Sequence, residues 1–431
     1  MTKLLAKLVY KAFLPVGAVF AFQRRRKRDP AGFDWREYLL GRVPPRPVSA
    51  NCVWIHGVSL GEINATRTIV EELRRRTPDT VVVISSTTET GLARARELYP
   101  RLVVFQFPLD FTFAVREVLK RVRPSVIALM ELELWPNLID EATAYGVPIL
   151  VVNGRVTERS VQRFQYPLAH RLSRHMCSLL TWVGAQDATY ASRFIELGVR
   201  PDRVEITGSV KYDAADTSDH IAGQEELADA MGIKTDEPLW VCGSTGPGEE
   251  EAILEAYQRL LKDHANLQLA IIPRKPERFD EVAQLIVRHG YACLRRSSGA
   301  PVMPEGVDEP RPVFLGDTMG ELRKFYSLAT VVFVGRTLVP MGGSDVMEVA
   351  GLAKPIIVGP HTENFAEPVN MLLAEGALRQ ISAPGALATV VSDLLRHPER
   401  REQMGQAGRE AILSRAGASR KVVDRILEYL V

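Results

Sequence analysis

The sequence has little cysteine and none of the spacings typical of a structural metal site. The 431 residues include only four cysteines, Cys52, Cys177, Cys242 and Cys293, which lie far apart and form no CxxC pair. The eight histidines include no HExxH motif. A zinc ribbon needs closely spaced ligands and a disulfide framework needs many cysteines, so we expect neither. This usage predicts a reducing, cytoplasmic compartment, no metal and no cofactor.

The sequence also lacks a long hydrophobic run. The uncharged stretch from residue 12 to 23 is only 12 residues long and is interrupted by Pro15 and Gly17, whereas a spanning helix needs about 20 apolar residues. The content of 46% hydrophobic and 25% charged residues is ordinary for globular proteins. At about 150 residues per domain, the length predicts two or three domains.

A net positive charge is confined to one short segment. Residues 1–30 hold eight basic residues and one acidic residue, a charge of +7, so the net +2 leaves −5 for the other 401 residues. This mildly acidic body argues against a nucleic-acid partner. Lys3, Lys7 and Lys11 share one helix face, and five basic residues follow at 24–28.

Residues 1–30 are therefore predicted to be a membrane-interface helix whose basic run meets an anionic membrane surface. A tilted, snorkelling anchor is a variant of this interpretation. The alternatives are a helix packed on the body and a secretory signal, but a signal carries its charge before the apolar stretch rather than after it.

Val- and Ile-rich runs alternate with amphipathic stretches over the rest of the chain. This pattern is typical of buried parallel strands and predicts two doubly wound, Rossmann-like α/β domains. The expected strands cover residues 53–58, 80–86, 102–107, 126–130, 148–153, 179–185, 203–207, 239–244, 267–272, 292–296, 313–315, 331–334, 355–358 and 379–381.

We divide the chain into the membrane-interface segment and four further parts. These are a first Rossmann-like domain at 31–212, a polar linker at 213–227, a second Rossmann-like domain at 228–400, and a final helix at 401–431 that could cross back to the first domain. Two such domains facing across a cleft occur in nucleotide-sugar glycosyltransferases, epimerases and binding proteins, so the fold alone leaves the function open.

In the first domain, acidic residues follow two predicted strands. Glu62 ends the segment HGVSLGE at a helix N-terminus, where it could be a general base or only a capping carboxylate. Glu131 and Glu133, in the segment MELELWPN, follow the predicted strand at 126–130. They could be functional or could form a structural network.

In the second domain, Ser244 and Thr245 begin a strand-to-helix turn that could offer N–H groups to a phosphate, although it lacks the lysine of a P-loop. Arg274 could meet an anion or be simply solvated. Gly342 and Gly343 would let the backbone approach a ligand. Glu348, expected in a capping box with Asp345, could chelate ribose hydroxyls.

Nine segments, taken in order, carry a family resemblance over nearly the whole chain: HGVSLGE, MELELWPN, VNGRVTERS, GSVKYD, GSTGPGEE, PRKPERF, GDTMGEL, FVGRTLVPMGG and GPHTENF. This set resembles the 3-deoxy-D-manno-octulosonic acid (Kdo) transferases of lipopolysaccharide synthesis. The resemblance implies a metal-independent GT-B fold. It also implies inverting transfer of Kdo from CMP-Kdo to the lipid A precursor lipid IVA at the cytoplasmic face of the inner membrane.

The resemblance also implies roles for individual residues. Glu62 would be the base, and Glu131 and Glu133 would shape the acceptor-side loop. The CMP-Kdo side would comprise Lys211, Ser244, Thr245, Arg274, Gly342, Gly343 and Glu348.

The chain departs from the usual family patterns STHEGEE and GGHNxLE at several positions, Gly246 and Ser344 among them. These departures leave open a GT-B enzyme that uses another nucleotide sugar. A non-catalytic, membrane-docked homologue is a further alternative, against which the presence of Glu62 argues.

Deleting residues 1–28 is expected to move the protein from the membrane fraction to the soluble fraction, because it removes the apolar face and the basic run together. Ultracentrifugation of lysates followed by immunoblotting measures the distribution. Continued sedimentation of the truncated protein with membranes would mean that another surface binds them.

Overall fold

The computed structural model describes residues 34–46, 50–164, 166–215, 217–299, 301–306 and 310–430. The predicted membrane-interface segment at 1–30 lies outside the described residues. The chain divides into two compact units. Unit 1 comprises Met1–Ala214 with Arg415–Val431, and unit 2 comprises Ala215–Ser414.

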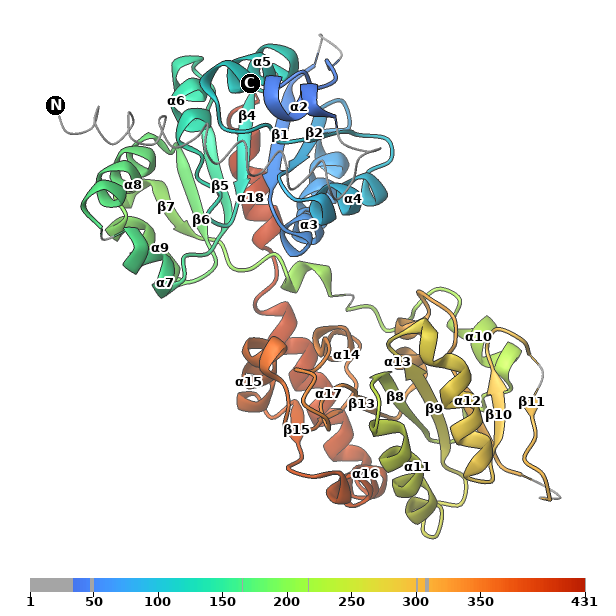
Figure 1. Cartoon of the computed structure of the whole chain (residues 1–431). Coiled ribbons are helices and arrows are strands. Elements are labelled where there is room, and N and C mark those ends of the chain that lie inside the picture. The colour runs from blue at the N-terminus through green and yellow to red at the C-terminus, as the bar shows by residue number, and fades with distance from the viewer. Residues whose placement is uncertain are drawn as a thin grey trace. The chain divides into compact units, whose positions relative to one another are not determined.

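Unit 1 is built on a parallel sheet of seven strands in the order β3-β2-β1-β4-β5-β6-β7 (Figure 1). The strands are β1 (Cys52–Gly57), β2 (Val81–Ser86), β3 (Val103–Gln106), β4 (Val126–Met130), β5 (Ile149–Gly154), β6 (Trp182–Ala185) and β7 (Val204–Ile206). The chain order reverses between β1 and β4, which pair directly. Such a reversal opens the crevice where open α/β sheets bind their ligands.

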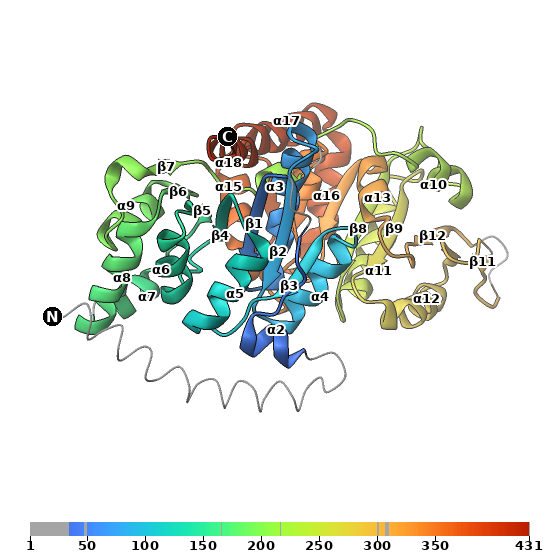
Figure 2. The ribbon, with the colours of Figure 1, turned by 90° about the horizontal axis from the view of Figure 1, so that it is seen from above.

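Helices cover both faces of this sheet (Figures 1 and 2). Side chains alternate along β1, so Trp54 belongs to the core on one face and Ile55 to the core on the other. The helices are α2 (Trp35–Leu40), α3 (Leu60–Arg76), α4 (Glu89–Leu98), α5 (Thr112–Val122), α6 (Pro136–Ala144), α7 (Glu158–Phe164), α8 (Pro167–Leu179), α9 (Ala188–Glu196) and α18 (Ala418–Leu427).

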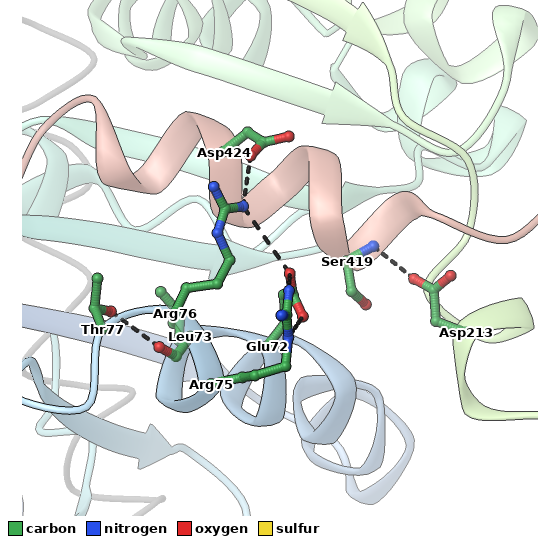
Figure 3. Close-up of polar contacts among 8 residues, drawn as sticks. All are labelled: Glu72, Leu73, Arg75, Arg76, Thr77, Asp213, Ser419 and Asp424. Carbon is green, nitrogen blue, oxygen red and sulfur yellow. Dashed lines mark hydrogen bonds and ion pairs between the residues drawn. The ribbon is translucent and has the colours of Figure 1, made fainter.

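The C-terminal helix α18 lies beside α3 in unit 1 (Figure 3). The Asp213 carboxylate accepts hydrogen bonds from the N–H groups of Gly417 and Ser419 and so caps α18, while Arg76 of α3 pairs with Asp424. The expected single helix over 401–431 is instead two helices. Gly417 adopts a left-handed φ of 101°, which separates α17 (Pro398–Leu413) in unit 2 from α18 in unit 1.

Unit 2 contains an eight-stranded sheet in the order β11-β10-β12-β9-β8-β13-β14-β15. The strands are β8 (Leu239–Thr245), β9 (Gln268–Pro273), β10 (Ala292–Arg295), β11 (Pro301–Val302), β12 (Pro312–Leu315), β13 (Val331–Val334), β14 (Ile356–Val358) and β15 (Leu378–Gln380). All of these strands pair in parallel except the short edge strand β11. The chain order reverses between β8 and β13, the counterpart of the reversal in unit 1.

Helices on both faces complete unit 2 (Figure 1). Besides α17 they are α10 (Gln224–Met231), α11 (Glu249–Leu260), α12 (Phe279–Arg288), α13 (Leu322–Leu328), α14 (Met347–Gly351), α15 (Ala366–Ala374) and α16 (Leu387–Arg396). The first residues of α10 fall within the segment expected to be a linker, 213–227.

The predicted fold class is confirmed, because each unit is a doubly wound α/β layer structure of the Rossmann type, the pair that makes up a GT-B protein. Within the described residues, no helix has the length and apolarity that crossing a membrane requires.

Candidate active site

Three carboxylates gather where β1 and β4 of unit 1 end. Glu62 lies in the first turn of α3, directly after β1, and Glu131 and Glu133 follow β4. Glu62 raises the pKa of both other carboxyls, which places the three within electrostatic reach of one another. The structure therefore brings together the three acidic residues that the sequence singled out in the first domain.

The Glu62 side chain is fixed by hydrogen bonds and is only 8% exposed. Its Oε2 accepts the Val58 N–H at 2.9 Å, and its Oε1 accepts the Ser59 hydroxyl at 2.8 Å and the Ser59 N–H at 3.3 Å. Ser59 Oγ in turn accepts the Glu62 N–H at 3.2 Å. This is a capping box, so the capping interpretation is confirmed, and the same bonds hold the carboxylate in one orientation.

Glu131 adopts a left-handed φ of 51°, a conformation that costs free energy in a residue other than glycine and is typical of functional sites. Burial, with Glu62 adding to it, raises the pKa of Glu131, while Arg155 and Lys211 act in the opposite direction. Glu131 N–H donates to the Val152 carbonyl at 3.0 Å and so fixes the turn to β5.

Glu133 titrates in a different range from an ordinary carboxyl. Burial raises its pKa to about 8, with Glu62 and then Glu131 adding to the shift and the Trp135 indole opposing it. Glu133 is therefore mostly protonated at neutral pH. It adds no full negative charge to the cluster and can donate a hydrogen bond.

His56, in the same HGVSLGE segment, is a packed core residue and does not titrate near neutral pH. The ring is fully buried, packs on Phe107 with centroids 4.4 Å apart, and its Nδ1 lies 2.8 Å from Ser85 Oγ. Burial lowers its pKa to about 3, so the ring is neutral. Its contacts hold the end of β1 against β2.

A pocket of about 530 Å³ opens beside Glu131 and Glu133. Its other polar lining comes from the segment after β5, namely Arg155, Thr157, Ser160 and Arg163. The sequence carries this segment as VNGRVTERS, to which no role was assigned. Its position could have been inferred, since β4 and β5 are neighbouring parallel strands whose carboxyl ends share one edge.

Lys211 belongs to a different unit from the residues with which the sequence grouped it. It belongs to unit 1, follows β7 and is exposed, and its charge lowers the pKa of Glu131. The other residues expected on the CMP-Kdo side, Ser244 to Glu348, all belong to unit 2.

In unit 2, a buried carboxylate ties together the loops that follow β8 and β13. Glu249 is fully buried, and its Oε2 accepts N–H groups from Gly246 at 2.8 Å and Arg336 at 2.6 Å. Its Oε1 accepts those of Thr337 and Leu338, both at 2.8 Å. Burial raises the pKa of Glu249, and these four bonds lower it. Nothing in the sequence indicated that Glu249 binds these loops, because an acid at the start of a helix usually lies in solvent.

These loops bring most of the predicted donor-side residues to one edge of the unit 2 sheet. Ser244 has a left-handed φ of 56°, and Thr245 is 1% exposed. A Cβ at Gly335 would lie 2.6 Å from Thr245 Cα, so β13 needs glycine there to pass the end of β8. Among the described residues, the buried hydroxyls of Thr245 and Ser344 have no hydrogen-bond partner, as expected for groups that meet a ligand.

The backbone at the glycine pair adopts a conformation that favours glycine. Gly342 and Gly343 have left-handed φ values of 80° and 86°, and a Cβ at Gly342 would lie 2.1 Å from Asn364 Nδ2. Arg274 follows β9 with an exposed side chain, and its N–H donates to the Thr245 carbonyl at 3.0 Å.

The predicted capping box of Asp345 and Glu348 is wrong. Asp345 Oδ1 accepts the Met347 N–H at 2.8 Å, and the N-cap of the five-residue helix α14 is Val346, without a side-chain cap. The Asp345 side chain closes a turn two residues long instead of reaching the third helical position. Glu348 lies in the first turn of α14, 3.5 Å from Arg323.

Comparison with known proteins identifies the family. Residues 34–214 match the sequence model described as 3-deoxy-D-manno-octulosonic-acid transferase (kdotransferase). The chain is 34% identical to a 3-deoxy-D-manno-octulosonic acid transferase of Haemophilus influenzae over 88% of its length and 87% of that protein. It is 33% identical to one of Bordetella pertussis over 98% of each chain. The chain belongs to the Kdo transferase family.

Solved structures support the fold of this Kdo transferase family member. UDP-GlcNAc 2-epimerase from Neisseria meningitidis, bound to UDP-GlcNAc, aligns with a TM-score of 0.56 at 14% identity over 88% of this chain and all of that one. A glycosyltransferase from Rickettsia africae aligns with a TM-score of 0.54 at 10% identity over 89% of this chain and 99% of that one. At these identities the likeness shows the fold alone.

Gly246, one of the departures from the family pattern, has little free space around its Cα. A Cβ at Gly246 would lie 2.8 Å from Met341 Sδ and 3.2 Å from Arg336 Cγ. A side chain at position 246 would therefore require Met341 and Arg336 to move.

The substitution Glu133→Gln is expected to make the stability of the folded protein decrease less steeply as the pH rises. The pKa of Glu133 is raised from 4.5 to about 8 in the folded state. Between these values the folded protein keeps a proton that the unfolded chain releases, so stability falls as pH rises through this window. A glutamine has no such proton.

Circular dichroism monitors thermal unfolding of the wild type and the variant at pH 5, 6.5 and 8, and the quantity compared is the midpoint temperature. Glu158→Gln, at an exposed position of α7, is the matched control. Parallel curves for the wild type and Glu133→Gln would contradict the raised pKa.

Proposed function

We propose that this chain transfers Kdo from CMP-Kdo to a sugar hydroxyl of the lipid A precursor lipid IVA, with inversion at the anomeric carbon. The observation that carries the proposal is a Glu62 carboxyl group fixed by hydrogen bonds at the switch point of a chain that belongs to the Kdo transferase family. The fold alone would also suit an epimerase, so the carboxylate and the family together decide between them.

Glu62 is proposed as the general base. Among the described residues, only Val58 donates a hydrogen bond to Glu62 Oε2, which therefore keeps a lone pair for the acceptor hydroxyl. The hydroxyl oxygen attacks the anomeric carbon, its proton passes to Glu62, and the bond from that carbon to the CMP phosphate oxygen breaks. Base catalysis of this kind contributes about 10²–10⁴-fold.

Glu131 and Glu133 shape the loop on the acceptor side in this proposal. The protonated Glu133 offers a hydrogen-bond donor, and its neutrality limits repulsion with Glu62. Lys211, next to Glu131, is assigned to the Kdo end of the donor, whose carboxylate it would attract.

The donor nucleotide is assigned to unit 2. Ser244, Thr245 and Arg274 would meet the phosphate, and Gly342 and Gly343 would let the backbone approach it. Glu348 is assigned to the ribose hydroxyls. Because CMP leaves with a negative charge, donors preorganised around its phosphate are expected to supply a large share of the rate enhancement.

The lipid acceptor proposed above and the sequence of the N-terminal segment support a location at a membrane. We propose that residues 1–30 hold the protein at the cytoplasmic face of the inner membrane, where lipid A precursors of a Gram-negative envelope would be available. No step of the proposal uses a metal, a cofactor or a nucleic acid.

The substitution Glu62→Gln is expected to lower the transfer rate at least about 100-fold, since the amide cannot accept the proton. Affinity for CMP, measured by calorimetry, is expected to stay within about twofold. Glutamine keeps one oxygen, which can accept the N–H of Val58 or that of Ser59, and the N–H of residue 62 still donates to Ser59 Oγ, so the start of α3 should persist.

Ser59→Ala is the matched control. It removes the reciprocal bond of the capping box at a cost of about 1 kcal/mol but leaves the carboxylate in place. Most of the transfer activity should remain. Equal losses in both variants would show that Glu62 acts only as a cap.

A further inference from the structure

The pocket beside Glu131 and Glu133 has the size of a ligand site, and the rest of its lining has no role in the proposed function. Its volume of about 530 Å³ falls in the range of small-molecule sites, roughly 300–1,000 Å³. The loop after β4 forms one side of it, and the loop after β5 with α7 forms another. All of these elements belong to unit 1, so the pocket exists without any contribution from unit 2.

Two arginines dominate the charge of this pocket. Arg155 follows β5 directly, and its Nε donates to the Tyr190 hydroxyl at 3.4 Å, which orients the guanidinium. Arg163 lies on α7 with an exposed side chain and forms no ion pair with any residue that the structure describes. Of the two carboxyls that face these arginines, Glu133 keeps its proton near neutral pH. The positive charge of the arginines therefore exceeds the negative charge of the lining.

The rest of the lining is suited to a group that is anionic at one end and apolar at the other. The hydroxyls of Thr157 and Ser160 lie 2.9 Å apart on the wall that carries the arginines. Leu132 and Phe164 add apolar surface. Planar guanidinium groups pair well with phosphate oxygens because each can donate two parallel N–H bonds.

We propose that this pocket binds a phosphate group of the acceptor glycolipid through Arg155 and Arg163, and so orients the sugar hydroxyl toward Glu62. The inference rests on the proposed function, because lipid IVA is a phosphorylated, acylated disaccharide. It adds the positioning residues and the chemical group that they recognise. Glu131 lines the pocket and follows β4, which pairs in parallel with β1, the strand before Glu62, so the pocket and Glu62 lie at the same edge of the sheet.

The test compares Arg163→Ala with the wild type on two acceptors, the tetraacyl disaccharide with its phosphates and the same molecule after phosphatase treatment. Arg163→Ala is expected to raise KM for the phosphorylated acceptor at least about tenfold. Its kcat and its KM for CMP-Kdo should stay within about twofold of the wild type. On the dephosphorylated acceptor the two proteins should behave alike.

Arg159→Ala is the matched control, because Arg159 is an exposed arginine of the same helix that does not line the pocket. Arg163→Lys should recover part of the lost affinity, since it restores the charge but not the planar pair of donors. If Arg163→Ala behaves like Arg159→Ala, the proposal is wrong. If KM rises for CMP-Kdo instead, the pocket serves the donor carboxylate and the proposal is also wrong.

A binding measurement separates this inference from the proposed function. Surface plasmon resonance with the phosphorylated acceptor in detergent micelles requires no turnover. Binding that depends on both the phosphates and Arg163 would support the pocket even if the wild type transferred no sugar. Phosphate-independent binding in a protein that does transfer Kdo would overturn the pocket assignment alone.

Discussion

The direct pairing of β1 with β4 is the constraint on which the candidate active site depends. The two strands are distant in sequence, yet their parallel register brings the loop of Glu62 and the loop of Glu131 and Glu133 to one edge. Three carboxyls within reach of one another cannot all ionise at ordinary pKa values. The cluster divides its roles accordingly. Glu62 is held by three donated hydrogen bonds, and Glu133 keeps its proton to about pH 8.

In unit 2, a single carboxyl group, that of Glu249, holds together the loops at the point where the chain order reverses. The strands β8 and β13 meet at this point, and Glu249 satisfies four backbone N–H groups of the loops that follow them. A buried acid with that many donors acts as the scaffold of the loops. Unpartnered hydroxyls of Thr245 and Ser344 remain for a ligand. In each unit, backbone N–H groups fix a carboxyl side chain, so these loops are shaped before substrates arrive.

Much of this could be predicted from the sequence, because buried parallel strands leave continuous apolar runs. Each predicted run contains an observed strand, and the strand that was missed, β11, has only two residues at an exposed edge. The position of Glu62 at a helix start followed from local pattern, since a capping box spans four residues.

What could not be predicted depends on contacts between distant segments. Lys211 lies beside Glu131 because of how the chain returns after β7, and the bonds of Glu249 join residues almost 90 positions apart. The pocket of Arg155 and Arg163 required the β4–β5 pairing. The division of the last helix at Gly417 depended on Asp213, some 200 residues earlier.

The most direct test of the account is a transfer assay with purified protein, radiolabelled Kdo activated in situ as CMP-Kdo, and a tetraacyl lipid A precursor, with EDTA present. Chromatography resolves the products. The account predicts labelled glycolipid in the presence of EDTA, with the number of bands giving the number of Kdo residues added. A folded protein that yields no labelled product with this donor, but does so with another nucleotide sugar, would contradict it.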